Sequence, residues 1–262
     1  MSLSNFDLNQ NYYSFNENNS TPIVFIHGVG LDHQMWEPQI EAFKNYSTLT
    51  YDLLGHGKTP WTKENLDFED FSNQLNQLLN HLKLKKIYLV GFSLGSLIAL
   101  NFAAKNEDKI EKLILIGTTY KRSDQERALV LDRYNQAKLN KPISKMALKR
   151  WFSDEYLKNH PKTYDLFMNI LQKNSNDHKN FLKAYKLFAN HKDDPEIIKK
   201  IKTKTLVITG SLDPGSTPFM SKELCKDLVN ADFIEIKNGK HLCSIECSDD
   251  VNMNIEKFIK NY

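Results

Sequence analysis

The chain has 262 residues, enough for one large α/β domain with a sizeable core, and its 35 Lys and Arg against 32 Asp and Glu give a net charge of +3. The basic residues are scattered rather than gathered into one block, which argues against a nucleic-acid partner. Residues 1–20 carry neither a basic cluster nor the apolar centre of a signal peptide, and no segment approaches the roughly 18 apolar residues of a membrane span, so we expect a cytoplasmic protein with no membrane partner.

Short apolar runs rich in β-branched residues alternate with longer amphipathic stretches, as is typical of an α/β fold. Strands are predicted over 21–28, 47–55, 85–93, 112–119, 204–211 and 231–238. Helices are predicted over 67–84, 94–106, 217–230 and 249–262. Several of the strand segments are apolar on both faces, which favours a mostly parallel central sheet flanked by helices.

The pattern changes between residues 120 and 195, where strand signals vanish and the sequence becomes helical, basic and aromatic. A helical block between two strands of one sheet predicts an inserted cap over one edge of that sheet. We therefore expect a first part of the core over 1–119, a helical cap over 120–195 and the second part of the core over 196–262.

The segment "VGFSLGS" (90–96) places Ser93 between Gly91 and Gly95. A predicted strand leads into this segment and a predicted helix begins directly after Ser93. This strand, turn and helix is the context that a nucleophile elbow requires. We therefore predict that Ser93 is a nucleophile; the alternative is an ordinary turn flanked by glycines.

A nucleophilic serine needs a base and a group that holds the base. His241 follows the last predicted strand, and Asp213 follows the strand before it, so parallel strands bring both to the same edge as Ser93. The order Ser, Asp, His matches α/β-hydrolases and differs from the two common serine-protease folds. Asp193 and Asp194 are alternatives to Asp213, but they precede their strand.

The segment "FIHGVG" (25–30) is a strand that leads into a turn. Its backbone N–H at Val29 is expected to join the N–H of Leu94, at the start of the helix after Ser93, in an oxyanion hole. His27 and His56 are expected to have structural roles.

Together, "HGVG" (27–30), "YDLLGHGKT" (51–59), "GFSLGS" (91–96), "GSLDP" (210–214) and "GKH" (239–241) resemble the α/β-hydrolase superfamily. The segment "LKRWFSDEYLKNHP" (148–161) is similar to 3-oxoadipate enol-lactonases. One departure is Ser96, where those lactonases usually have glycine. The resemblance implies 3-oxoadipate enol-lactone as a candidate substrate.

Several side chains are candidates for the walls of the site. Phe92 flanks the proposed nucleophile and is expected to touch substrate, and Trp151 and Phe152 either line an acyl pocket or serve as packing. Lys149 and Arg150 are either solvated or attract a substrate carboxylate.

The sequence predicts a serine hydrolase of a small ester or lactone, its only expected partner being that small molecule. His241 takes the proton of Ser93, Asp213 orients His241, and the reaction proceeds through an acyl-enzyme without a cofactor. The alternatives are hydrolysis of a carbon-carbon bond in a ring-cleavage product, perhydrolysis, and a binding protein with little turnover. The sequence carries no signal for an oligomeric state.

The three cysteines, Cys225, Cys243 and Cys247, do not suggest a disulfide framework. The spacing of Cys243 and Cys247, with His241 nearby, resembles part of a metal-binding pattern. The usual zinc pattern needs a second pair of ligands, which the sequence lacks. We therefore expect no metal.

Overall fold

A computed structural model describes residues 2–61, 64–139, 144–176 and 178–261. Within them lies an eight-stranded sheet with the order β1-β2-β4-β3-β5-β6-β7-β8. Its strands are β1 (Ser2–Phe6), β2 (Tyr12–Asn16), β3 (Ile23–Ile26), β4 (Thr48–Tyr51), β5 (Ile87–Phe92), β6 (Ile110–Ile116), β7 (Thr205–Gly210) and β8 (Ala231–Ile236). Strands β3 to β8 pair in parallel, and β1 and β2 add an antiparallel hairpin beside β4.

The sheet divides the core into two hydrophobic clusters. In β3, Ile23 and Phe25 pack into one cluster, and Val24 and Ile26 pack into the other, because successive side chains of a strand point to opposite faces. All four side chains are fully buried, so this strand has no polar face. Such strands need a helical layer on each side.

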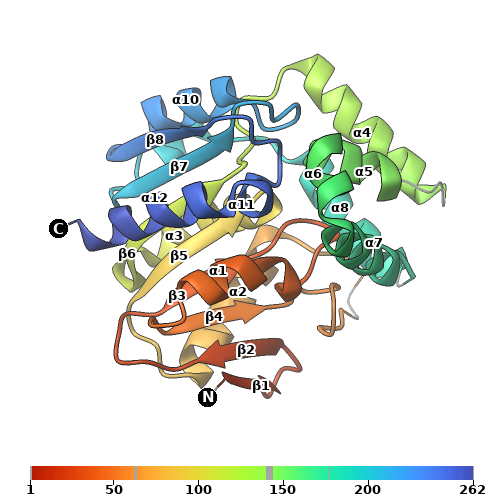
Figure 1. Ribbon diagram of the computed structural model, residues 1–262. Helices are drawn as coiled ribbons and strands as arrows, with labels where there is room; N and C mark the ends of the chain where they lie inside the picture. The colour runs from red at the N-terminus through yellow and green to blue at the C-terminus, as the bar shows by residue number, and fades with distance from the viewer. Residues whose placement is uncertain (1, 62–63, 140–143, 177, 262) are drawn as a thin grey trace.

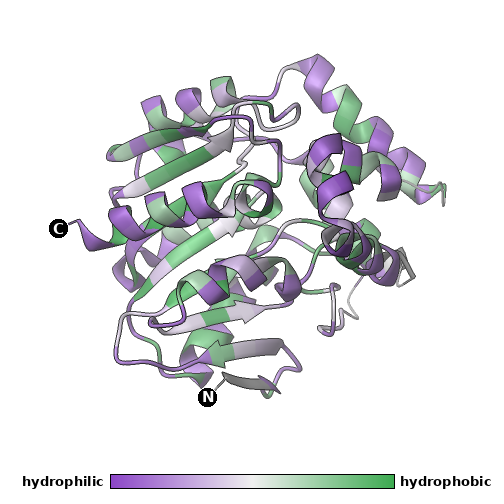
Figure 2. Ribbon diagram, viewed as in Figure 1, coloured by the Kyte–Doolittle hydropathy of each residue, from purple (hydrophilic) through white to green (hydrophobic). Residues whose placement is uncertain are grey.

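Helices supply those two layers. One face carries α2 (Phe68–His81), α3 (Leu94–Asn106) and α10 (Pro218–Asp227), and the other carries α1 (Glu37–Ala42), α11 (Cys243–Glu246) and α12 (Ser248–Lys260). The described residues also include two short 3-10 helices, η1 (His33–Trp36) and η2 (Glu107–Lys109). In Figure 2 the central strands are largely hydrophobic, while the helices around them alternate between hydrophobic and hydrophilic stretches.

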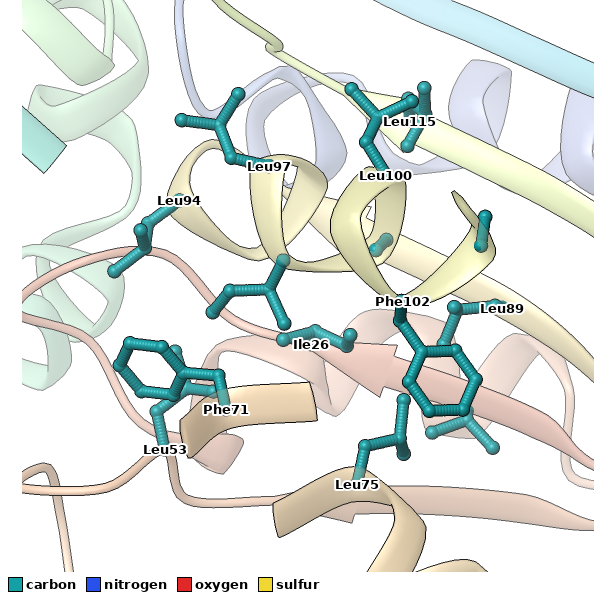
Figure 3. Close-up of a cluster of buried hydrophobic side chains, with 14 of the residues drawn as sticks. Ile26, Leu53, Phe71, Leu75, Leu89, Leu94, Leu97, Leu100, Phe102 and Leu115 are labelled. Carbon is teal, nitrogen blue, oxygen red and sulfur yellow. The ribbon is translucent and has the colours of Figure 1, made fainter. Parts of the chain in front are cut away.

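Helix α3 is buried along most of its length because it lies between the sheet and α2. Figure 3 shows Phe102 on the side of this helix that faces Leu89 of β5 and Leu75 of α2, and Leu97 on the opposite side of the helix. At roughly 25 cal/mol for each Å² of apolar surface, this burial makes α3 a large contributor to folding. The helix that follows Ser93 is therefore firmly fixed.

Between β6 and β7 the chain forms helices α4 (Asp124–Lys138), α5 (Ser144–Trp151), α6 (Asp154–Asn159), α7 (Pro161–Asn176), α8 (His178–Asn190) and α9 (Pro195–Ile198). We call α4 to α8, residues 124–190, the helical insertion. Figure 1 shows it beside the arrowhead ends of the parallel strands. These are the carboxyl ends, where the loops after the strands lie.

The predicted fold class, a mostly parallel sheet flanked by helices, is confirmed. The hairpin of β1 and β2 was not predicted. None of the helices in the described part of the chain is both long enough and apolar enough to span a bilayer.

Candidate active site

Ser93 occupies the turn between β5 and α3. Its backbone φ of 54° and ψ of −114° fall in a region that side-chain-bearing residues rarely adopt. The Ser93 N–H donates to the carbonyl of Ile116 at 2.9 Å, which ties the turn to the neighbouring strand β6. This strained geometry is that of a nucleophile elbow.

Gly91 and Gly95 are required by the close approach of backbone segments around this turn. A Cβ on Gly91 would collide with the carbonyl of Gly95, and a Cβ on Gly95 would collide with the carbonyl of Ile26. The two glycines therefore let β5, α3 and β3 come together beneath Ser93.

Ser96, the departure from the lactonase pattern, has a structural role. Its hydroxyl donates to the carbonyl of Gly91 at 2.7 Å and lies 3.1 Å from the carbonyl of Ile116. The side chain is fully buried and joins the start of α3 to the ends of β5 and β6.

His241 and Asp213 are brought together by the loops after β8 and β7. Nδ1 of His241 lies 2.6 Å from Oδ2 of Asp213. The other oxygen, Oδ1, accepts the backbone N–H groups of Gly215 at 2.8 Å and Ser216 at 2.9 Å. This contact favours the tautomer with the proton on Nδ1, in which Nε2 is the acceptor.

Ser93, Asp213 and His241 line one pocket, whose empty volume is about 840 Å³ with adjoining solvent included. Among the described residues no hydrogen bond joins Ser93 to His241. Such bonds often tighten only when substrate binds.

The backbone donors expected for the oxyanion hole have no competing partner in the part of the chain that the structure describes. Within the described residues, neither the N–H of Val29 nor that of Leu94 is donated to a protein acceptor. Val29 lines the pocket, and Leu94 is the first residue of α3, where backbone N–H groups lack intrahelical acceptors. The two donors are therefore available to an anion.

The three residues predicted to touch substrate are placed differently. Phe92 and Trp151 line the pocket. Phe152 is outside the pocket lining and fully buried, stacked on Tyr156 with ring centroids 5.5 Å apart and packed against Phe167. Its position in the structure is that of a packing residue.

The structure also separates the remaining alternatives. Asp193 accepts the N–H of Lys121 at 2.8 Å, and Asp194 caps α9, so neither approaches His241. Of the two basic candidates, Arg150 lines the pocket and Lys149 is exposed outside it.

Several pocket residues were missed at the level of sequence. They include Thr119 after β6, Arg133 of α4 and Tyr185 of α8. Thr119 is the last residue of a predicted strand and so had a positional signal, but a helical surface arginine has none.

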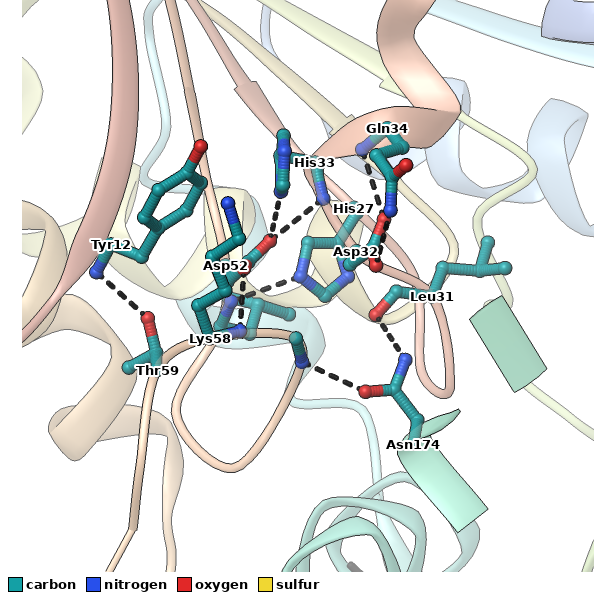
Figure 4. A network of polar contacts seen from close by, with 12 residues as sticks. Tyr12, His27, Leu31, Asp32, His33, Gln34, Asp52, Lys58, Thr59 and Asn174 are labelled. Atoms are coloured by element: carbon teal, nitrogen blue, oxygen red, sulfur yellow. Dashed lines mark hydrogen bonds and ion pairs between the residues drawn. The ribbon is translucent and has the colours of Figure 1, made fainter. Parts of the chain in front are cut away.

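A buried polar network holds the loop after β3 in place (Figure 4). Nδ1 of His27 lies 2.8 Å from the carbonyl of Gly28, and its Nε2 accepts the N–H of Leu53 at 2.9 Å. Burial, with a smaller effect of His56, lowers the pKa of His27 to about 3. His27 is therefore neutral and structural, as expected.

Asn174 of α7 joins the helical insertion to this loop. Its amide nitrogen donates to the carbonyls of Gly30 and Leu31, both at 3.1 Å, and its amide oxygen accepts the N–H of Gly57 at 2.8 Å. The side chain is 3% exposed, so these bonds are shielded from water.

Asp32, His33 and Asp52 are the one group within the described residues whose ligand atoms are close enough to hold a metal ion. The Asp52 oxygens already accept protein donors, from His33 at 2.9 Å and Lys58 at 2.7 Å. Burial raises the pKa of Asp52, but the hydrogen bonds and charge of His33 have the larger combined effect. The net result is a lowered pKa of Asp52. We interpret this group as part of the structural network.

The pair Cys243 and Cys247 does not have the properties of a thiolate site. Burial raises the pKa of Cys247 to about 11 and also raises that of Cys243, which is fully buried. Neutral thiols are poor metal ligands.

Comparison with known proteins gives a consistent result. A family model described as the alpha/beta hydrolase fold matches residues 21–246. The chain is similar to the (E)-2-((N-methylformamido)methylene)succinate hydrolase of Acinetobacter baylyi, with 26% identity over 99% of this chain and 97% of that protein. It is also similar to 3-oxoadipate enol-lactonase 1 of the same organism, with 26% identity over 93% of this chain and 90% of that protein.

Among solved structures, the chain is similar in fold to the enol-lactonase of Burkholderia xenovorans. The TM-score is 0.87 at 24% identity, over 97% of this chain and 98% of that one. At this identity the likeness concerns the fold.

Proposed function

The chain belongs to the alpha/beta hydrolase fold family, and on that premise we propose that it is a serine hydrolase of small carboxylic esters or lactones. The observation that carries the proposal is the 2.6 Å contact between His241 Nδ1 and Asp213 Oδ2 beside a pocket that also contains Ser93. A fold alone does not specify an activity, so the argument rests on this geometry.

In the proposed reaction Nε2 of His241 takes the proton of the Ser93 hydroxyl as Oγ attacks the carbonyl carbon. The N–H groups of Val29 and Leu94 hold the resulting oxyanion. The tetrahedral adduct collapses, the alcohol or enol oxygen leaves with the proton from His241, and an acyl-enzyme remains. Water, deprotonated by His241, then releases the acid.

Asp213 has two roles in this scheme. It keeps the proton of neutral His241 on Nδ1, and it stabilises the imidazolium that forms during each proton transfer. Gly215 and Ser216 hold the Asp213 carboxylate in place through their backbone N–H groups, so its orientation does not depend on a substrate.

The substrate class is suggested by the similar proteins. The relative named as 3-oxoadipate enol-lactonase supports 3-oxoadipate enol-lactone as the first candidate. In this proposal residues 120–195 form a cap, because Trp151 and Tyr185 of the helical insertion line the same pocket as Ser93.

A second candidate is hydrolysis of a bond other than an ester, such as a carbon-carbon bond in a ring-cleavage product. The relative named as a substituted methylenesuccinate hydrolase favours a bond other than an ester, because its substrate name contains a formamido group, which is an amide, and no ester. The same triad would serve this reaction, since the fold and the nucleophile do not determine which bond is broken.

The proposal is tested by replacing Ser93 with Ala and measuring steady-state hydrolysis of 4-nitrophenyl acetate and of a panel of lactones, short esters and ring-cleavage products. We expect Ser93→Ala to lose at least about 10³ in kcat. Labelling with a fluorophosphonate probe should occur in the unaltered protein and disappear in the variant, which distinguishes an enzyme from a binding protein.

The matched control is Ser96→Ala, which removes a serine hydroxyl three residues away that bonds two backbone carbonyls. It should keep its kcat within about threefold and its probe labelling. Full activity of Ser93→Ala would overturn the assignment, and turnover of ring-cleavage products alone would favour the second candidate.

A further inference from the structure

Two arginines from different helices of the insertion face the pocket that contains Ser93. Arg133 belongs to α4 and Arg150 to α5, and both line the pocket together with His241. Each side chain is only partly exposed. The two positive charges therefore lie on the part of the pocket wall that the insertion supplies.

Among the described residues, no acidic side chain compensates the positive charge of either arginine. Arg150 donates to the carbonyl of Met146 at 3.2 Å, and neither residue forms an ion pair with a described acidic side chain. Burial lowers the pKa of Arg150, and the charge of Arg133 lowers it further. Two cations that are close together and partly buried are unfavourable unless an anion joins them.

Other arginines of the insertion region show the contrast. Arg122 donates to the carbonyls of Phe188 and His191, both at 3.0 Å, and Arg127 donates to the carbonyl of His191 at 2.9 Å. These two arginines join the end of α8 to the segment that leads into α4. Within the described residues, by contrast, Arg150 donates to a carbonyl of its own helix and Arg133 contacts the hydroxyl of Tyr185 in the pocket.

Two hydroxyl groups accompany the arginines. Burial raises the pKa of Tyr185, and the nearby Arg133 and Arg150 oppose that rise, so its hydroxyl lies within their field and remains protonated. Among the described residues the buried hydroxyl of Thr119 has no hydrogen-bond partner, and Thr119 lines the pocket. A buried hydroxyl without a partner is costly and favours a polar ligand.

We infer that Arg133 and Arg150, with the hydroxyl of Tyr185, form a site for a carboxylate group carried by the substrate, away from the bond that Ser93 attacks. A guanidinium matches a carboxylate with two parallel hydrogen bonds, and two guanidiniums can share one. The inference rests on the proposed function and narrows it to esters or lactones that carry a free acid. Holding the acid at this end orients the carbonyl toward Ser93.

The test compares two substrates that differ by one charge, mono(4-nitrophenyl) adipate and its methyl ester. The unaltered protein should hydrolyse the acid with a kcat/KM at least about tenfold above that of the methyl ester. In Arg133→Met and Arg150→Met, this ratio should fall by about 10- to 100-fold, mainly through a higher KM for the acid. Arg150→Lys, which keeps the charge but loses the paired geometry, should recover part of the ratio.

The matched control is Lys149→Met, which removes a positive charge from the neighbouring position, exposed outside the pocket. Its acid-to-ester ratio should equal that of the unaltered protein. The carboxylate site would be overturned if Arg150→Met kept the acid-to-ester ratio of the unaltered protein. It would also be overturned if Lys149→Met lowered this ratio as much as Arg150→Met does.

Calorimetric titration of adipate into Ser93→Ala separates this inference from the proposed function. If Ser93→Ala binds adipate and the double variant Ser93→Ala, Arg150→Met does not, the site is supported. This holds even if neither ester is hydrolysed, a result by which the proposed function fails. Conversely, hydrolysis that depends on Ser93, without preference for the acid and without adipate binding, supports the function and rejects the site.

Discussion

Nδ1 of His241 lies 2.6 Å from Oδ2 of Asp213, although 27 residues separate the two in the chain. The contact exists because parallel strands β7 and β8 deliver their following loops to the same edge of the sheet. The Asp213 side chain is fully buried, so the hydrogen bond is protected from solvent. This pair is the most direct target for a test of the proposed chemistry.

Replacing Asp213 with Asn should lower kcat for 4-nitrophenyl acetate by about 10² to 10⁴, the upper value being the effect known for the equivalent change in a serine-protease triad. The amide can donate to His241 and so favours the tautomer with its proton on the wrong nitrogen. Stopped-flow or steady-state kinetics measure the loss, and thermal unfolding checks that the variant is folded.

The control for this change is Asp193→Asn, which alters a carboxylate that accepts the N–H of Lys121 at the edge of the insertion. Its kcat should stay within about threefold of the unaltered protein. Equal losses in the two variants would show that Asp213 acts through stability alone.

Replacing Gly95 with Ala should destabilise the protein by about 3 kcal/mol or more, or prevent its folding, because the new Cβ has no room beside the carbonyls of Ile26 and His27. Gly215→Ala is the comparison, since the nearest atom to its new Cβ is Asp213 Oδ1 at 3.8 Å. Urea unfolding of both variants measures the difference. A Gly95→Ala protein as stable as Gly215→Ala contradicts the packing described beneath Ser93.

The buried histidines make stability depend on pH. Burial lowers the pKa of His27 to about 3 and that of His56 to about 4. Below the unfolded value of about 6.5, only the unfolded chain takes up these protons. The free energy of unfolding should therefore decrease on acidification, by about 1.4 kcal/mol per pH unit for each histidine, until its folded pKa is reached.

The variant His27→Asn should show a shallower decrease than the unaltered protein in urea unfolding at pH 7.5, 6 and 5, even though it starts from a lower stability. His160→Gln changes an exposed histidine and serves as the control. If His27→Asn and the unaltered protein have parallel curves, His27 does not contribute to the pH dependence.

Replacing Asn174 with Ala should lower kcat for 4-nitrophenyl acetate by about tenfold or more. The carbonyls of Gly30 and Leu31 lose their shared donor, and the neighbouring Val29 N–H loses its fixed position. Chemical denaturation should also show a loss of about 1–3 kcal/mol, because buried acceptors are left without partners. Asn190→Ala, at an exposed site on α8, should change neither quantity.

The sequence was sufficient for most of the sheet but not for its edge. Strands β3 to β7 have apolar, β-branched segments that are buried on both faces over much of their length, so their pattern is strong. Strand β2 carries Asn and Ser among its buried Tyr and Phe residues, and its partner β1 ends at Phe6, which is 42% exposed. An edge hairpin with so little apolar content resembles a loop in sequence.

The walls of the pocket show where sequence reasoning ends. Trp151 and Phe152 are adjacent aromatic residues with the same expected role, yet only Trp151 lines the pocket. Helix α5 ends at Trp151, and the chain then turns Phe152 into the cluster around Phe167. Arg133 reaches the pocket only because α4 packs on α8, which no local pattern encodes.

The backbone N–H of Leu242 donates to the carbonyl of Trp151 at 3.0 Å, which joins the last residue of α5 to the residue after His241. Because both partners are main-chain atoms, the bond does not depend on which side chains the insertion carries. Substitutions at Arg133, Arg150 or Trp151 can remodel the pocket wall while the loop of the proposed base keeps its attachment. The scaffold is therefore suited to the evolution of new substrate preferences without renewed selection for the triad geometry.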